Sequence, residues 1–243
     1  MPLHGAEIES EKQALPPTSH KSYKVLIISN LFFVLASTFY LAAAAYDVQE
    51  NKTATATSTV TNLTPSVVLQ ILGGLAFVVV GLLDLYNTQK KVHFFLTLAG
   101  LFAALRGFYL KSNYQLSSVF NMLSAHLFLL ESLDWIYSHF VKLKLDDNDS
   151  RKSSLLVAEA GDAFFFLGAL MDCIFSWIDI FKAPPPPGSA QGLASASGDV
   201  VSGILWLLAA LISTVLACRL GKQGFAGASG EGASMTAASG SMA

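Results

Sequence analysis

Four carboxylic acids interrupt an apolar stretch in the second half of the chain. Glu159, Asp162, Asp172 and Asp179 fall within residues 155–181, which contain no Lys, Arg or His. An ionised side chain in hydrocarbon is costly, so intramembrane acids usually pair with another group or line an ion pathway. The stretch therefore predicts buried carboxyl groups that need either a partner or a function.

A second polar stripe precedes this one. At about 100° per residue of helix, Glu131 and Asp134 lie about 60° apart, and His126 lies about 80° from Asp134. Burial and like charge both disfavour an ionised carboxyl. With no base expected nearby, Glu131 and Asp162 should be protonated, or hydrogen-bonded to each other or to His126. His139 is predicted to lie just past the membrane, in solvent.

Arg106 is the only base predicted inside a membrane span. Its expected depth matches Asp172 or Asp179. Two interpretations follow. The first is a structural ion pair between helices. The second is a counter-charge that competes with a transported proton or cation for a set of candidate ligands, namely Glu131, Asp134, Asp162, Asp172 and His126.

The elements that carry these groups are long apolar runs. The chain has 243 residues, of which 53% are hydrophobic and 13% are charged, whereas soluble domains carry about 25% charged residues. Runs near 20 residues predict transmembrane helices, so the fold class is an all-α polytopic membrane protein with six spans. They are expected at about 23–46, 65–86, 92–110, 116–137, 155–181 and 198–218, between disordered tails at 1–21 and 221–243.

Basic residues predict the orientation, since cytosolic loops are enriched in Lys and Arg. With the N-terminus in the cytosol, 11 of the 15 basic residues lie on the cytosolic side and 3 lie in outer loops. The same orientation places two glycosylation sequons, at Asn51 and Asn62, outside, and the one at Asn148 inside. Both termini are therefore predicted to be cytosolic. The first span is expected to stay uncleaved, although residues 42–45 offer an alternative signal-peptide cleavage site.

Several functional classes find no support in the sequence. The two cysteines lie in or at the end of apolar runs, and the histidines are scattered over separate elements, so no metal site, cofactor or catalytic grouping is expected. A net charge of -2 gives no general attraction to nucleic acid. The prediction is a non-enzymatic protein of the plasma membrane or endomembrane system, structural or accessory, with the bilayer and other membrane subunits as partners. The alternative is a proton- or cation-coupled transporter or channel.

Overall fold

Six helices make up the described part of the protein. The computed structural model describes residues 20–53, 64–88, 90–110, 112–145, 149–181 and 189–238, and it contains no strand within these ranges. The all-helical prediction is confirmed for this part of the chain. The helices are α2 His20–Thr53, α3 Pro65–Thr88, α4 His93–Tyr109, α5 Tyr114–Leu145, α6 Asp149–Ile180 and α7 Ala190–Ala238.

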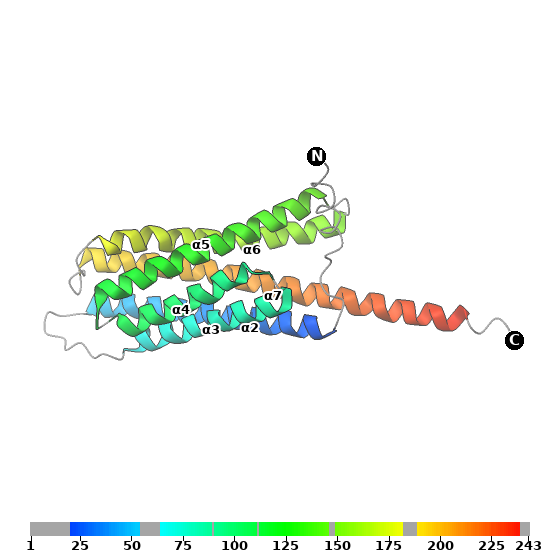
Figure 1. Ribbon diagram of the computed structural model, residues 1–243, viewed down its shortest axis with the longest axis horizontal. Helices are drawn as coiled ribbons and strands as arrows, with labels where there is room; N and C mark the ends of the chain where they lie inside the picture. Colours follow the sequence, from blue (N-terminus) through cyan, green and yellow to red (C-terminus); the bar gives the residue numbers. More distant parts are fainter. Residues whose placement is uncertain are drawn as a thin grey trace.

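The helices form a closed ring. Each one packs against the helix before it and the helix after it, and α7 returns to pack against α2 (Figure 1). The connections on either side of α4 are short, which makes successive helices antiparallel neighbours. Within the described residues, no other pair of helices brings its backbones close together, so α4 and α7 face each other across the ring.

Five helices, all except α4, are long and apolar enough to cross a membrane. The α4 helix is apolar but has only 17 residues, or about 25 Å at 1.5 Å per residue, against about 30 Å for the hydrocarbon core. Its flanking residues Val92 and Leu110 keep helical backbone angles, which lengthens the helical path slightly.

Aromatic side chains fill the middle of the ring. Phe77, Phe128, Phe165 and Trp206 come from four different helices and are nearly inaccessible to solvent. Phe128 lies centrally, with its ring centroid 4.8 Å from Phe77, 5.0 Å from Trp206 and 5.9 Å from Phe165. We call these four side chains the aromatic core.

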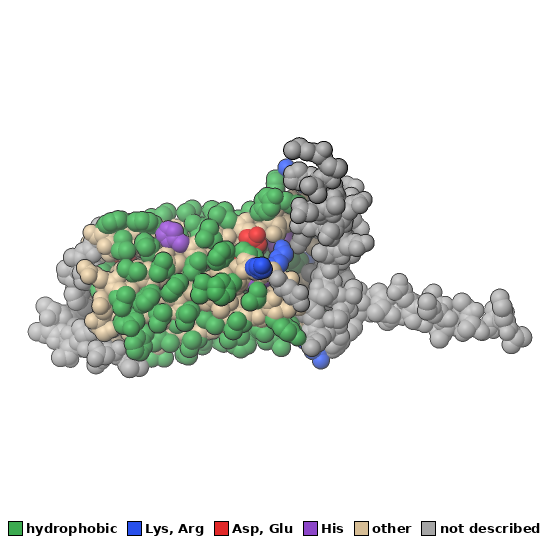
Figure 2. Space-filling model, in the orientation of Figure 1, with side chains coloured by type: hydrophobic (Ala, Val, Ile, Leu, Met, Phe, Trp, Pro, Cys, Tyr) green, Lys and Arg blue, Asp and Glu red, His purple; other side chains and the backbone are tan. Residues whose placement is uncertain are grey.

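Large apolar side chains cover much of the outer surface. Large exposed side chains such as Leu31, Leu82, Leu130 and Ile174 point outward, while many buried residues are Ala, Ser or ionisable. Figure 2 shows hydrophobic side chains over most of one face, with charged groups near the end from which α7 projects. Such a surface suits lipid rather than water. With the five long apolar helices, it marks the chain as a helical membrane protein.

Glycines bring α3 and α4 into backbone contact. A Cβ atom added to Gly74 would lie 2.4 Å from the backbone nitrogen of Ala104, and one on Gly100 would lie 2.6 Å from that of Val78. Neither position has room for a side chain. Small residues at such crossings allow the close approach that stabilises membrane helices.

Several helix ends differ from the sequence prediction. The α2 helix runs from His20 to Thr53, α6 begins at Asp149 and α7 begins at Ala190, so each extends beyond its predicted span. The α5 helix continues past residue 137 to Leu145, so His139 lies on the helix and not in a loop. The α7 helix continues to Ala238, through most of the segment for which low complexity predicts disorder. These last two helix ends were predicted too early, because the apolar pattern ends before the helix does.

Candidate functional site

Ionisable side chains gather at two levels of the ring, on either side of the aromatic core. We call the first level the histidine end. It lies where α2, α4 and α6 begin and contains Ser29, Asp84, His93, Glu131, His139, Glu159 and Asp162. The second is the arginine end, near the opposite ends of the same helices, with Tyr40, Gln70, Arg106, Asp172, Asp199 and Ser202.

Glu131 has a base beside it, contrary to the prediction. His93 Nδ1 lies 2.7 Å from Glu131 Oε1, and Trp135 Nε1 donates a hydrogen bond of 2.9 Å to the same oxygen. Glu131 is 0% exposed, and its Oε2 atom is buried without a hydrogen-bond partner. The sequence pattern missed His93 because this residue belongs to another helix, α4, and begins it.

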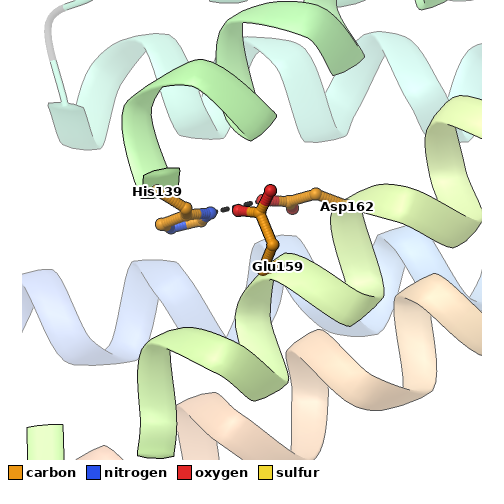
Figure 3. Close-up of side chains that lie close together, drawn as sticks. All are labelled: His139, Glu159 and Asp162. Carbon is orange, nitrogen blue, oxygen red and sulfur yellow. Dashed lines mark hydrogen bonds and ion pairs between the residues drawn. The ribbon is translucent and has the colours of Figure 1, made fainter. Parts of the chain in front are cut away.

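Asp162 also pairs with a histidine. His139 Nδ1 on α5 is in hydrogen-bond contact with Asp162 Oδ2 on α6, so the prediction that His139 is solvated was wrong. The extra two turns of α5 bring this side chain alongside α6. Glu159 lies one turn before Asp162, and Figure 3 shows its carboxyl group next to the His139–Asp162 contact. Its Oε2 atom is buried and has no hydrogen-bond partner.

Asp84 on α3 belongs to the histidine end, and Asp134 on α5 lies near it. Ser29 Oγ on α2 donates a hydrogen bond of 2.6 Å to Asp84 Oδ1 on α3. Asp134 is half-buried on α5, one turn from Glu131. The Ser29–Asp84 hydrogen bond joins α2 to the neighbouring helix α3.

Arg106 pairs across the ring. Its Nη2 atom donates a hydrogen bond of 3.0 Å to Asp199 Oδ2 on α7, and the two side chains are 12% and 19% exposed. The predicted partners Asp172 and Asp179 were therefore wrong. Asp199 was assigned to the very start of the last span, but α7 begins earlier, at Ala190, which places Asp199 within the ring. Asp179 instead accepts a hydrogen bond of 3.3 Å from Ser195 Oγ.

A small cavity adjoins this ion pair. Its volume is about 10 Å³, and its lining includes Tyr40, Arg106, Asp172, Asp199 and Ser202. That volume is at the lower limit for one water molecule. Asp172 therefore shares a polar space with Arg106 without being its direct partner.

The hydrogen-bond partners of His126 are not acids. Its Nδ1 atom lies 2.7 Å from the carbonyl oxygen of Met122, and Trp177 Nε1 donates a hydrogen bond of 3.2 Å to its Nε2 atom. A carbonyl only accepts, so the imidazole carries its proton on Nδ1 and accepts on Nε2, as a neutral ring does. The predicted stripe of His126 with Glu131 and Asp134 is therefore not assembled.

The sequon residues are only partly described. Asn51 lies in the last turn of α2, where its Nδ2 atom donates a hydrogen bond of 2.9 Å to the carbonyl oxygen of Asp47. Asn62 lies outside the described residues. Glycosylation of both remains a prediction.

Comparison with known proteins adds no further assignment, since no family model, curated protein or solved structure matches this chain. The chemistry open to this site therefore follows from the geometry of its own residues. Acids on α3, α5, α6 and α7 each face a polar group on another helix: Ser29, His93, His139 or Arg106.

Proposed function

We propose that the chain is a six-span membrane protein with a structural or accessory role, in which the buried acids join helices. It would act in the plasma membrane or endomembrane system, without catalysis. The observation that carries this proposal is the pairing of intramembrane acids with donors on other helices. Polar contacts of this kind specify which helices meet, because the alternative is an unsatisfied group in hydrocarbon.

The aromatic core supports the same role. It lies between the histidine end and the arginine end and fills the ring with side chains from α3, α5, α6 and α7. The α5–α6 interface, where the strongest transport candidates lie, is occupied by the Phe128–Phe165 and Trp135–Phe165 contacts. A packed interface there favours a structural use of Asp162 over an ion path.

In the proposed topology α4 also crosses the membrane, as the third of six spans, and both termini are cytosolic. The closed ring supports this, since α4 packs between α3 and α5. Glycans on Asn51 or Asn62, with none on Asn148, would agree with the topology. The opposite pattern would contradict it.

A flux assay tests the structural role. Purified wild-type protein, Asp162→Asn and Asp172→Asn are reconstituted into sealed vesicles under proton, Na⁺ or K⁺ gradients. We expect no flux above empty vesicles for any of the three, and a lower unfolding temperature for both variants. Flux by the wild type that both variants lose would contradict the proposal.

That contrary outcome would favour a proton- or cation-coupled transporter or channel. One observation speaks for it, namely the cavity at the arginine end, where Asp172 lies near Arg106 and Asp199 inside the ring. In that function Glu131, Asp162 and Asp172 would bind the cargo, and Arg106 would compete with it for the acids.

A further inference from the structure

Three metal-ligating side chains converge at the histidine end, on the α5–α6 pair. They are His139, Glu159 and Asp162, and the ligand atoms they offer all lie within 4.8 Å of one another. Glu159 and Asp162 are three residues apart on one helix, which places them on the same face. Figure 3 shows all three side chains directed toward a common point between the two helices.

We propose that His139, Glu159 and Asp162 form a binding site for a divalent transition-metal ion, of the Zn²⁺ or Mn²⁺ type. Imidazole and carboxylate ligands bind such ions at about 2.0–2.2 Å, so ligand atoms around one ion are at most about 4 Å apart. The most distant of these atoms would have to approach by less than about 1 Å, and the His139 and Asp162 atoms now in hydrogen-bond contact would separate to admit the ion.

The state of Glu159 points to a ligand. Its Oε2 atom is buried and has no hydrogen-bond partner, although it adjoins the Asp162 carboxyl. A buried polar atom without a partner costs free energy. A cation bound between the two carboxyl groups would provide that partner and balance their charge.

The donor set selects the class of ion. One nitrogen and two carboxylate oxygens suit Zn²⁺ or Mn²⁺, whereas Ca²⁺ takes six to eight oxygen ligands and Mg²⁺ prefers oxygen and water. Three protein ligands leave at least one position for water. The ion would displace the proton shared by His139 and Asp162, since a ligating histidine is neutral and a ligating carboxyl is ionised.

The site is reached from the histidine end without passing the aromatic core. The His139 side chain is 29% exposed, while that of Asp162 is 7% exposed. An ion would therefore enter along His139 and be held by Asp162 at the inner side. Bound there, it would cross-link α5 to α6 and stabilise the pair.

Metal binding to the full chain in lipid nanodiscs tests the site. After chelator treatment, Mn²⁺ binding is followed by electron paramagnetic resonance and Zn²⁺ binding by calorimetry, with Mg²⁺ for comparison. We expect one saturable Mn²⁺ or Zn²⁺ ion per chain and a rise in unfolding temperature on binding. Substituting a ligand should weaken binding by about 10- to 100-fold or more, because even the loss of an outer-shell partner costs that much.

Glu159→Gln is the decisive variant. It removes a carboxylate oxygen that has no hydrogen-bond partner, so the metal-free protein should unfold at the wild-type temperature or above it. The variant keeps every histidine of the chain and should nevertheless lose the metal-dependent rise. Asp134→Asn, an acid near the same end but outside the cluster, is the matched control and should keep it.

The opposite results overturn the site. They are no saturable binding by the wild type, or equal binding by the wild type and Glu159→Gln. Either result would mean that His139 and Asp162 form a hydrogen-bonded pair but no metal site. The vesicle assay of the structural role does not depend on this result, so the two proposals fail separately.

Discussion

Both ends of the ring pair buried acids with a base on another helix, but the bases differ. At the arginine end the base is a guanidinium, which stays charged at any relevant pH. At the histidine end the bases are the imidazoles of His93 and His139. The first arrangement is a permanent ion pair, and the second consists of histidine–carboxyl contacts.

The two ends also differ in the helices they join. Arg106 reaches from α4 to Asp199 on α7, across the ring. His93 and His139 each bind an acid on the next helix along the ring, α5 and α6 respectively. The arginine end therefore holds opposite sides together, whereas the histidine end holds neighbours together. This difference predicts unequal effects of substitution.

The largest effect is expected at Arg106. In Arg106→Met, Asp172 and Asp199 are left near each other without a base, and breaking a buried ion pair costs about 3–5 kcal/mol. Asp199→Asn should cost less, because Arg106 retains Asp172 beside the same cavity. The free energy of unfolding in mixed micelles measures both. An equal loss of unfolding free energy in the two variants would mean that Asp172 does not stabilise Arg106 when Asp199 is replaced.

A comparable but smaller effect is expected at the aromatic core that separates the ends. Phe128→Ala removes the side chain that contacts Phe77, Phe165 and Trp206, and a cavity of this kind costs about 3–4 kcal/mol. Phe108→Ala is the matched control, since this ring is 66% exposed. The same unfolding measurement applies. A loss at Phe108 as large as that at Phe128 would show that the core is not the main packing centre.

The smallest effect is expected at the histidine end. In Glu131→Gln the amide oxygen still accepts from Trp135 Nε1, so only the charge of the contact with His93 is lost, at about 1 kcal/mol. Asp134→Asn, one turn away and half-buried, should change stability by less than about 0.5 kcal/mol. Unfolding curves of both variants give the comparison. A loss at Glu131 that matched the one at Arg106 would remove the contrast between the two ends.

The class of protein followed from local features of the sequence. Low charge and long apolar runs predicted an all-helical membrane protein, and the predicted spans overlap all six helices. These signals are local, because a helix in lipid satisfies its own backbone hydrogen bonds and needs only enough consecutive apolar residues. The same logic identified Arg106, Glu131, Asp162 and Asp172 as groups that require an explanation.

Which polar groups meet depends on how the helices pack together. His93 and Glu131 are 38 residues apart, and Arg106 and Asp199 are 93 apart. Helical periodicity gives the face of each residue on its own helix, but it does not give the order of helices around a ring or their relative rotation. Those depend on close approaches such as Gly74 with Ala104, and on the exact helix ends that carry His93 and His139 into the bundle. The partners of the buried acids were therefore fixed by packing between helices, which no single stretch of sequence contains.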